Sequence, residues 1–179
     1  MKSPKKITKQ VFSAKLFHVD EVQLTYSDGD NVTHHVAIRK PTVSVFPLTD
    51  QYELYLVSQY RYLLEKQSLE AMAGFINEHE TPLHAAKREL QEETGIRAEQ
   101  FEFLRSIDIS ASVFLAKNYL FLAKGLTLGE PHPDLHESIE VVKVPLDVAV
   151  QKVMDGEITA SSSIIGILLL DRLRKEKKL

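Results

Sequence analysis

The N-terminal part of the chain shows the alternation of apolar and polar side chains that is typical of β-strands. Val11 to Tyr26 alternates loosely, and Val32 to Arg39 reads as a second strand. Between them, residues 27–31 (Ser-Asp-Gly-Asp-Asn) give a strong turn signal. The pattern therefore predicts an antiparallel β-hairpin extension within residues 1–40, ahead of a main domain over residues 41–179.

The main domain reads as a series of short strands with helices among and after them. Apolar runs bounded by turn residues predict strands at Val43–Phe46, Glu53–Gln59, Ser68–Met72, Phe101–Ile107, Asn118–Ala123 and Ile139–Val144. Two late segments are predicted to be helices, Pro145–Asp155 and Ala160–Arg174.

An earlier helix is delimited by signals at both ends. Thr81 suits the N-cap, Pro82 the first helical position and Gly95 the C-cap, so the helix is predicted over Pro82–Thr94. At about 100° per residue, it divides into three faces. The face expected against the core carries Leu83, Ala86 and Leu90. The face expected in water carries His84, Lys87 and Gln91. The third face carries the glutamates Glu89, Glu92 and Glu93, with Ala85 beside them.

The three glutamates allow two interpretations. On an exposed face they are a solvated charged surface, and each like-charged pair costs a few tenths of a kcal/mol. If a sheet covers them, the cost rises to the order of several kcal/mol, and a bound cation becomes the better explanation. Carboxylate oxygens without cysteine or histidine nearby favour Mg²⁺ or Mn²⁺ over Zn²⁺.

Composition excludes several kinds of chemistry. Hydrophobic residues make up 44% and charged residues 26% of the chain, which is ordinary for a globular domain. The formal net charge of -3 gives no global indication of a nucleic-acid or membrane partner. The absence of cysteine excludes disulfides, thiolate metal sites and cysteine nucleophiles. With no secretory signal and no apolar run long enough to span a bilayer, a cytoplasmic protein is expected, and the lysines near both ends are expected to lie in solvated tails.

The stretch around the glutamates resolves the choice between a solvated surface and a cation site. Gly74, five residues, Glu80, seven residues and then Arg88-Glu-Leu-Gln-Glu-Glu-Thr-Gly-Ile96 reproduces the Nudix box at every fixed position. A chance match in a chain of this length is on the order of one in a million or less. The protein therefore resembles the Nudix hydrolases, which use a divalent metal to cleave a nucleoside diphosphate linked to another moiety.

The resemblance extends beyond the box, over roughly Lys15 to Leu170. Residues 59–61 (Gln-Tyr-Arg) and 69–74 (Leu-Glu-Ala-Met-Ala-Gly) are similar to the segment before the box in ADP-ribose and nucleoside diphosphate sugar pyrophosphatases. This resemblance implies an α/β fold, an α/β/α sandwich around a mixed sheet, and a homodimer whose contacts include the N-terminal extension.

The resemblance also implies roles for particular residues. The metal ligands are expected to be the carboxylates of Glu89, Glu92 and Glu93 with the backbone carbonyl of Ala73. Arg88 and Glu80 are expected to orient these glutamates through salt bridges. Arg61 is expected to contact substrate phosphate, and Glu70 either contacts the substrate or supports the structure.

The general base of this branch is expected from the loop over residues 131–138. Glu137 aligns best with the acidic residue before the Ile139 strand, and Glu140 is the second candidate; the alternative is that Glu137 is an ordinary solvated loop residue. His132 and His136 lie in the same loop, but Pro133 between them argues against a histidine metal pair.

Three functions follow from the resemblance. The first is Mg²⁺-dependent hydrolysis of nucleoside diphosphate sugars, with ADP-ribose cleaved to AMP and ribose 5-phosphate. ADP-ribose pyrophosphatases commonly carry a proline about sixteen residues beyond the box, where this chain has Ser-Ala-Ser-Val at residues 110–113, and this departure leaves room for GDP-mannose. The second is hydrolysis of dinucleoside polyphosphates, oxidised nucleotides or RNA 5′ ends. The third is a non-catalytic nucleotide-binding regulator, which the complete set of box carboxylates disfavours.

Overall fold

The computed structural model describes residues 3–110, 112–131 and 139–179. The chain divides into two compact units, Met1–Pro41 with Asp108–Lys117 and Thr42–Ile107 with Asn118–Leu179. The elements in chain order are β1 (Lys5–Ser13), β2 (Phe17–Thr25), β3 (Asn31–Arg39), β4 (Thr42–Pro47), β5 (Glu53–Arg61), β6 (Lys66–Glu70), β7 (Met72–Phe75), α1 (Pro82–Thr94), β8 (Arg97–Asp108), β9 (Phe114–Leu115), β10 (Lys117–Thr127), β11 (Ile139–Pro145), α2 (Leu146–Met154) and α3 (Ser161–Lys175).

The first unit is a β-sheet in the order β1-β2-β3-β9. The hairpin of β2 and β3 confirms the prediction from the turn at residues 27–31, with Phe17↔Arg39 and Thr25↔Asn31 as the outer pairs of an antiparallel ladder. The prediction of one strand over Val11–Tyr26 was wrong, because a turn in which the Ala14 N–H donates to the Phe17 carbonyl separates β1 from β2.

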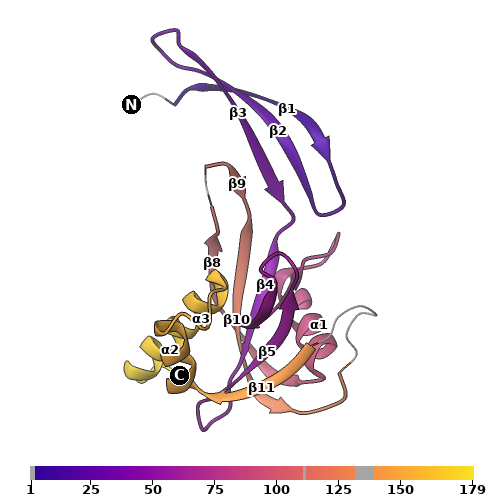
Figure 1. Ribbon diagram of the computed structural model, residues 1–179, viewed down its shortest axis with the longest axis vertical. Helices are drawn as coiled ribbons and strands as arrows, with labels where there is room; N and C mark the ends of the chain where they lie inside the picture. The colour runs from indigo at the N-terminus through magenta and orange to yellow at the C-terminus, as the bar shows by residue number, and fades with distance from the viewer. Residues whose placement is uncertain (1–2, 111, 132–138) are drawn as a thin grey trace. The chain divides into compact units, whose positions relative to one another are not determined.

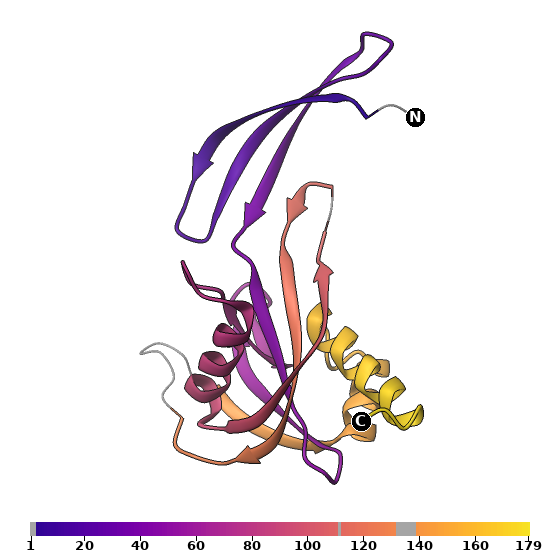
Figure 2. The same ribbon diagram turned by 180° about the vertical axis from the view of Figure 1, so that it is seen from behind.

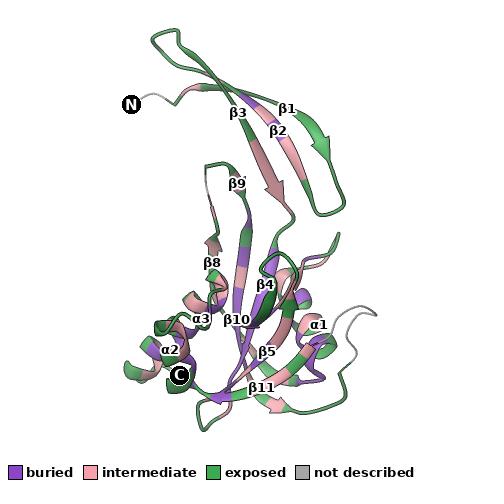
Figure 3. Ribbon diagram, in the orientation of Figure 1, coloured by how far each residue is buried: buried purple, intermediate pink, exposed green. Residues whose placement is uncertain are grey.

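Strand β1 also corrects the interpretation of the N-terminal lysines. Lys5, Lys6 and Lys9 lie in this strand rather than in an irregular tail, and they pair with residues of β2. All nine residues of β1 are exposed, whereas all six of β4 are buried (Figure 3). A strand that buries neither face has no apolar alternation, so the sequence pattern could not reveal β1.

The second unit is an α/β/α sandwich, as the resemblance implied. Its two sheets have the orders β7-β4-β10-β8 and β11-β5-β6. β10 runs parallel to β4 while β7 runs antiparallel to it, so the first sheet is mixed. Helix α1 lies on one side of these sheets and helices α2 and α3 lie on the other, as both opposite views show (Figures 1 and 2).

Strand β4 contributes to the hydrophobic core on both sides. Val43 and Val45 pack toward α1 with Ala86 and Leu90, whereas Phe46 belongs to the core beneath α2 and α3. The close approach of α3 depends on a glycine, since a Cβ at Gly166 would lie 1.9 Å from Cζ of Phe46. No helix among the described residues is long and apolar enough to cross a membrane.

The segment before the box differs from its prediction. A single strand was expected over Ser68–Met72, but the chain forms β6 and β7 with Ala71 alone between them. The two strands belong to different sheets, since β6 pairs with β5 and β7 pairs with β4. The chain therefore crosses from one sheet to the other at Ala71.

Candidate active site

Helix α1 carries the glutamates and is capped at both ends. The Thr81 hydroxyl accepts a hydrogen bond from the His84 N–H at 3.2 Å, and Gly95 adopts a left-handed φ of 71° while its N–H donates to the Gln91 carbonyl. The predicted bounds of this helix are confirmed. These caps satisfy backbone groups that a helix otherwise leaves without partners.

One predicted face of α1 was wrong in detail. Leu83 is 37% exposed, while Ala85, which was placed beside the glutamates, is fully buried with Ala86 and Leu90. Compared with the prediction, α1 is therefore rotated about its own axis, and its glutamate side faces the sheet more directly. Glu93 is buried, with 6% of its surface exposed, and Glu89 is half-buried. The Glu92 side chain is 48% exposed.

Arg88 connects the carboxylates of the box. Its Nε and Nη2 donate to the two oxygens of Glu80, both at 3.0 Å. Its Nη1 donates to Glu89 Oε1 at 2.7 Å and to Glu92 Oε2 at 2.9 Å. Its Nη2 also donates to the Phe75 carbonyl at 2.9 Å. One guanidinium thus fixes the positions of three acidic side chains and ties α1 to the end of β7.

The charges in this network shift the pKa values of its members. Hydrogen bonds from Arg88, opposed by burial and assisted by the Asn77 N–H, lower the pKa of Glu80. The hydrogen bond to Glu80 raises the pKa of Arg88, and Glu89 and Glu92 add to the effect against the opposing influence of burial. Each ionised form stabilises the other, so the pair stays charged at neutral pH.

Gly74 makes room for the Glu89 carboxylate. A Cβ at Gly74 would lie 1.8 Å from Glu89 Oε1 and 1.9 Å from its Cδ, which is far inside contact distance. Glycine is therefore required at this position because the carboxylate lies against the backbone of β7. The preceding residue, Ala73, is the predicted carbonyl ligand, and it pairs with Ser44 of β4.

A second pair of predicted site residues lies on the adjacent hairpin of β5 and β6. Arg61 Nε donates to Glu70 Oε1 at 3.0 Å, and Arg61 Nη2 donates to Glu70 Oε2 at 2.7 Å. Burial raises the pKa of Glu70, but hydrogen bonds from Arg61 and Ser68 and the charge of Arg61 outweigh it, so the pKa is lowered overall. Both oxygens of Glu70 are engaged by Arg61, which supports the interpretation that Glu70 holds this arginine.

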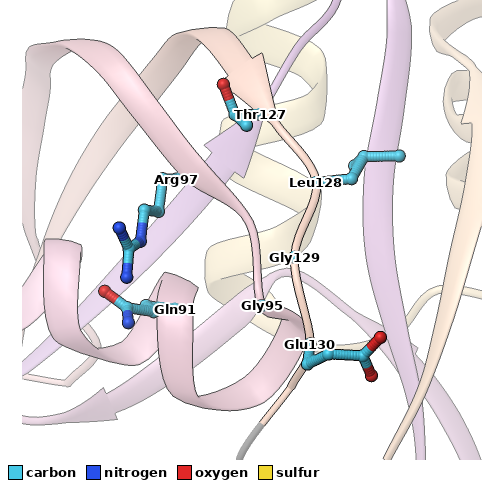
Figure 4. Close-up of a pocket in the computed structure, with 7 residues that line it drawn as sticks. All are labelled: Gln91, Gly95, Arg97, Thr127, Leu128, Gly129 and Glu130. Atoms are coloured by element: carbon cyan, nitrogen blue, oxygen red, sulfur yellow. The ribbon is translucent and has the colours of Figure 1, made fainter.

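A pocket of about 290 Å³ lies on a different face of α1, lined by Gln91, Gly95, Arg97, Thr127, Leu128, Gly129 and Glu130. Figure 4 shows the Gln91 and Arg97 side chains close together, while Glu130 points away from them. Two helical residues apart correspond to about 200° around the axis, so Gln91 faces away from both Glu89 and Glu93. This pocket is separate from the carboxylate cluster.

Other predicted residues are not brought to the site by the described structure. Glu140 lies on β11, is exposed and pairs with Ser58 of β5. Glu137, His132 and His136 lie outside the described residues. The sequence missed the Phe75 carbonyl as an acceptor for Arg88, because a backbone oxygen leaves no trace in the residue type.

The site suits a hard divalent cation. It offers carboxylate oxygens, which Mg²⁺ and Mn²⁺ prefer, and Gly74 leaves the space that a carboxylate against β7 requires. The predicted carbonyl ligand, Ala73, directly precedes Gly74 in β7. Within the described ranges, no three His, Asp or Glu side chains are already grouped as a metal cage. Glu89 and Glu92 are instead turned toward Arg88, so metal binding requires them to exchange or share that contact.

Comparison with known proteins places these features in context. The NUDIX domain family matches residues 38–161. The chain is 32% identical over 167 residues to a methanol dehydrogenase activator of Bacillus methanolicus, covering 91% of this chain and 89% of that protein. It is 29% identical over 165 residues to an ADP-ribose pyrophosphatase of Bacillus subtilis, covering 90% and 88%. The crystal structure of an ADP compounds hydrolase superposes on this chain with a TM-score of 0.86 at 24% identity. The superposition covers 100% of this chain and 98% of that one, so the two chains share a fold.

Proposed function

This chain belongs to the NUDIX domain family, and we propose that it hydrolyses the pyrophosphate bond of nucleoside diphosphate sugars, with ADP-ribose cleaved to AMP and ribose 5-phosphate as its main reaction. The observation that carries the proposal is the fit between Gly74 and Glu89 beside the Arg88 network. The Glu89 carboxylate lies against the backbone of β7, where a solvated surface glutamate would have no reason to lie.

The metal site is proposed to consist of Glu89, Glu92, Glu93 and the Ala73 carbonyl, occupied by Mg²⁺ or by Mn²⁺ in its place. Such an ion, when bound, neutralises phosphate charge and lowers the pKa of a coordinated water. Arg88 would keep Glu89 and Glu92 in place through Nη1 and would limit their mutual repulsion before the ion binds. Glu80 in turn holds Arg88, because both of its carboxylate oxygens accept hydrogen bonds from the guanidinium.

The substrate contact is proposed for Arg61. An arginine beside a diphosphate provides a fork of N–H donors that matches phosphate oxygens. Glu70 holds the Nε and Nη2 edge of this guanidinium, so its role is to fix the orientation of Arg61 rather than to touch an anionic substrate itself. A carboxylate with a lowered pKa is charged at neutral pH and would repel phosphate if it were the contact.

The remaining assignments rest on the family resemblance. Glu137, outside the described residues, is proposed as the general base, with Glu140 second. A homodimer is proposed as the assembled form. The preference for ADP-ribose is supported by the named activity of the Bacillus subtilis relative, and GDP-mannose is retained as a further substrate.

The experiment is a product analysis with Mg²⁺ and, separately, ADP-ribose, GDP-mannose and UDP-glucose, resolved by chromatography. AMP from ADP-ribose at much the highest kcat/KM is the expected outcome. Comparable release of GMP from GDP-mannose would instead indicate a broad nucleotide-sugar hydrolase. No product from any of the three would reject the proposal and move the search to dinucleoside polyphosphates, oxidised nucleotides and RNA 5′ ends. Binding of ADP-ribose without hydrolysis would point to a nucleotide-binding regulator.

A second candidate is activation of a dehydrogenase, which is favoured by the 32% identity to the methanol dehydrogenase activator over 91% of this chain. The two candidates are compatible, since an activator can also be a hydrolase. The test adds the purified protein to a methanol dehydrogenase and measures the initial rate of methanol oxidation. An unchanged rate at equimolar protein would remove this candidate without touching the hydrolase proposal.

A further inference from the structure

At the crossing between the two sheets of the second unit, Ala71 lies outside both hydrogen-bond ladders. β6 pairs with β5 as far as Val57↔Glu70, and β7 begins its pairing with β4 at Val45↔Met72. Ala71 lies between them and is 2% exposed. Its N–H donates to Oγ of Ser163 at 2.9 Å, across a sequence separation of 92 residues.

Ser163 is placed to make this bond by the start of α3. It lies in the first turn of that helix and is 1% exposed. A buried N–H without an acceptor is strongly unfavourable, and a strand neighbour cannot supply one at a residue where the chain changes sheets. The hydroxyl of Ser163 therefore satisfies the donor that the crossing would otherwise leave orphaned.

Functional groups flank this crossing closely on both sides. Glu70, immediately before Ala71, holds Arg61 through two hydrogen bonds. Ala73 and Gly74 follow shortly after, and Gly74 is where the Glu89 carboxylate meets the backbone. Any displacement of Ala71 would move the arginine on one side and the Ala73 carbonyl on the other.

We propose that Ser163 is a positioning residue of the active site, whose hydroxyl fixes the crossing at Ala71 and thereby sets both the phosphate-binding arginine and the carbonyl ligand. The assignment rests on the proposed function, because it acts through Arg61 and Ala73. It gives α3 a role in catalysis although the helix lies on the opposite side of the sheets from α1 (Figure 2).

Helix α3 is held in place independently of this hydroxyl. Gly166 packs directly against the Phe46 ring, and near the other end of the helix Arg174 bonds to Asp147 of α2. Removing the Ser163 hydroxyl is therefore expected to loosen the crossing while leaving the helix docked. This independence makes the substitution informative, since the variant retains the contacts that fold the unit.

The test compares three variants under the same conditions. Ser163→Ala removes the acceptor, Ser163→Thr keeps a hydroxyl, and Ser161→Ala removes an exposed hydroxyl from the same turn as a matched control. For Ser163→Ala we expect kcat/KM for ADP-ribose to fall on the order of 10-fold to 100-fold, because small displacements of positioning groups have effects of this size. KM and the half-saturating Mg²⁺ concentration should both rise, and Ser163→Thr should restore most of the loss.

Hydrogen exchange at the Ala71 amide gives a readout that does not depend on activity. Ser163→Ala should accelerate its exchange by about 10-fold relative to wild type and to Ser161→Ala, the scale of an unsatisfied buried donor. Unchanged KM and Mg²⁺ dependence with a lower kcat would indicate a smaller folded fraction, and would overturn the positioning role. Equal kinetics and exchange in all variants would overturn it as well.

Failure of the proposed function can be distinguished from failure of this inference. If wild-type protein hydrolyses no nucleotide sugar, the proposed function fails and the catalytic role of Ser163 is rejected with it. If wild type is active but Ser163→Ala matches it, only the positioning role is rejected.

Discussion

Two arginines in the second unit, Arg88 on α1 and Arg174 on α3, each bind more than one carboxylate. The two clusters differ in how many acidic side chains share the arginine. Arg174 bonds to Asp147 and to Asp171, the latter at 2.9 Å, and Lys175 binds the second oxygen of Asp171 at 2.6 Å. Two acidic groups are thus matched by two basic ones. The Arg174 guanidinium also lies 5.7 Å from the Tyr52 ring centre, so this cluster joins α2, α3 and the turn before β5.

At Arg88, in the described part of the chain, one guanidinium is shared by Glu80, Glu89 and Glu92, and the buried Glu93 follows on the same helix. Matched charges at a helix junction stabilise a fold modestly. Carboxylates held close together on a partly buried helix face repel one another, and a bound cation would relieve that repulsion. This difference supports the proposal that the Arg88 cluster binds a metal ion, whereas the Arg174 cluster joins α2 and α3.

Glu93→Gln is the strongest test of this difference between the two clusters. The substitution keeps the size of the side chain but removes its charge, so we expect the fold to persist and kcat to fall by on the order of 10²–10³, the range for losing one electrostatic group at a reacting centre. Steady-state kinetics with ADP-ribose and Mg²⁺ measure the loss, and circular dichroism checks the fold. Glu78→Gln, at a side chain that is 87% exposed, is the matched control and should be neutral. Near-normal activity in Glu93→Gln would reject the metal assignment.

Gly74→Ala tests the same cluster from the backbone side. The new Cβ would lie 1.8 Å from Glu89 Oε1, so the carboxylate must move away from β7. We expect a loss of about 1–3 kcal/mol in the free energy of unfolding from overpacking, together with weaker Mn²⁺ binding. Denaturant unfolding and a Mn²⁺ titration followed by electron paramagnetic resonance would measure the two effects.

A second substitution makes the Gly74 test specific. Glu89→Asp shortens the side chain by one methylene, so the double variant should recover stability relative to Gly74→Ala alone. Additive losses in the double variant would show that the two positions do not meet as the structure describes.

The α1 site could be predicted from the sequence better than the framework around it. Caps and periodicity are local signals, which is why Thr81, Pro82 and Gly95 give the bounds of α1 correctly. The face that α1 buries depends on the sheet it meets, and the exposure of Leu83 could not be read from the helix alone. Likewise, the break at Ala71 depends on a hydroxyl 92 residues away.

The residue roles within the site also divide into those with a local sequence signal and those that depend on contacts across the fold. Helical periodicity grouped the three glutamates on one face of α1, and the resemblance to the Nudix box gave Arg88 its expected role. Contacts across the fold had no such signal, among them the Phe75 carbonyl that binds Arg88 and the pairing of Arg61 with Glu70 through both oxygens. Family resemblance made Arg61 and Glu70 candidates, but only the structure shows that one holds the other.

Arg61→Lys extends the comparison to a third arginine, Arg61, which binds both carboxylate oxygens of Glu70. A lysine keeps the charge but loses the fork that engages Glu70 on one edge. We expect KM for ADP-ribose to rise by about 10-fold, the scale of one hydrogen bond to a charged group, with a smaller effect on kcat. Glu70→Gln should produce a change in the same direction, because it releases the arginine without removing it. A variant Arg61→Lys with unchanged KM would exclude Arg61 as the phosphate contact.

The smallest effect is expected at the matched cluster, from Asp171→Asn. Hydrogen bonding from Lys175, opposed by burial and assisted by Arg174, lowers the pKa of Asp171 in the folded protein. A carboxyl with a depressed folded pKa stabilises the fold above its unfolded pKa of about 3.9, and this contribution disappears as the pH falls through the folded value. The free energy of unfolding of the wild type should therefore exceed that of the variant by no more than about 1 kcal/mol at pH 7, since the Lys175 and Arg174 side chains are partly exposed. The difference should narrow as the pH falls below about 3.9. Chemical denaturation at a series of pH values measures this difference, and ADP-ribose turnover at pH 7 should stay at the wild-type level.

A large loss of turnover would show that the α3 cluster, too, serves the active site, and the contrast between the two arginines would fail.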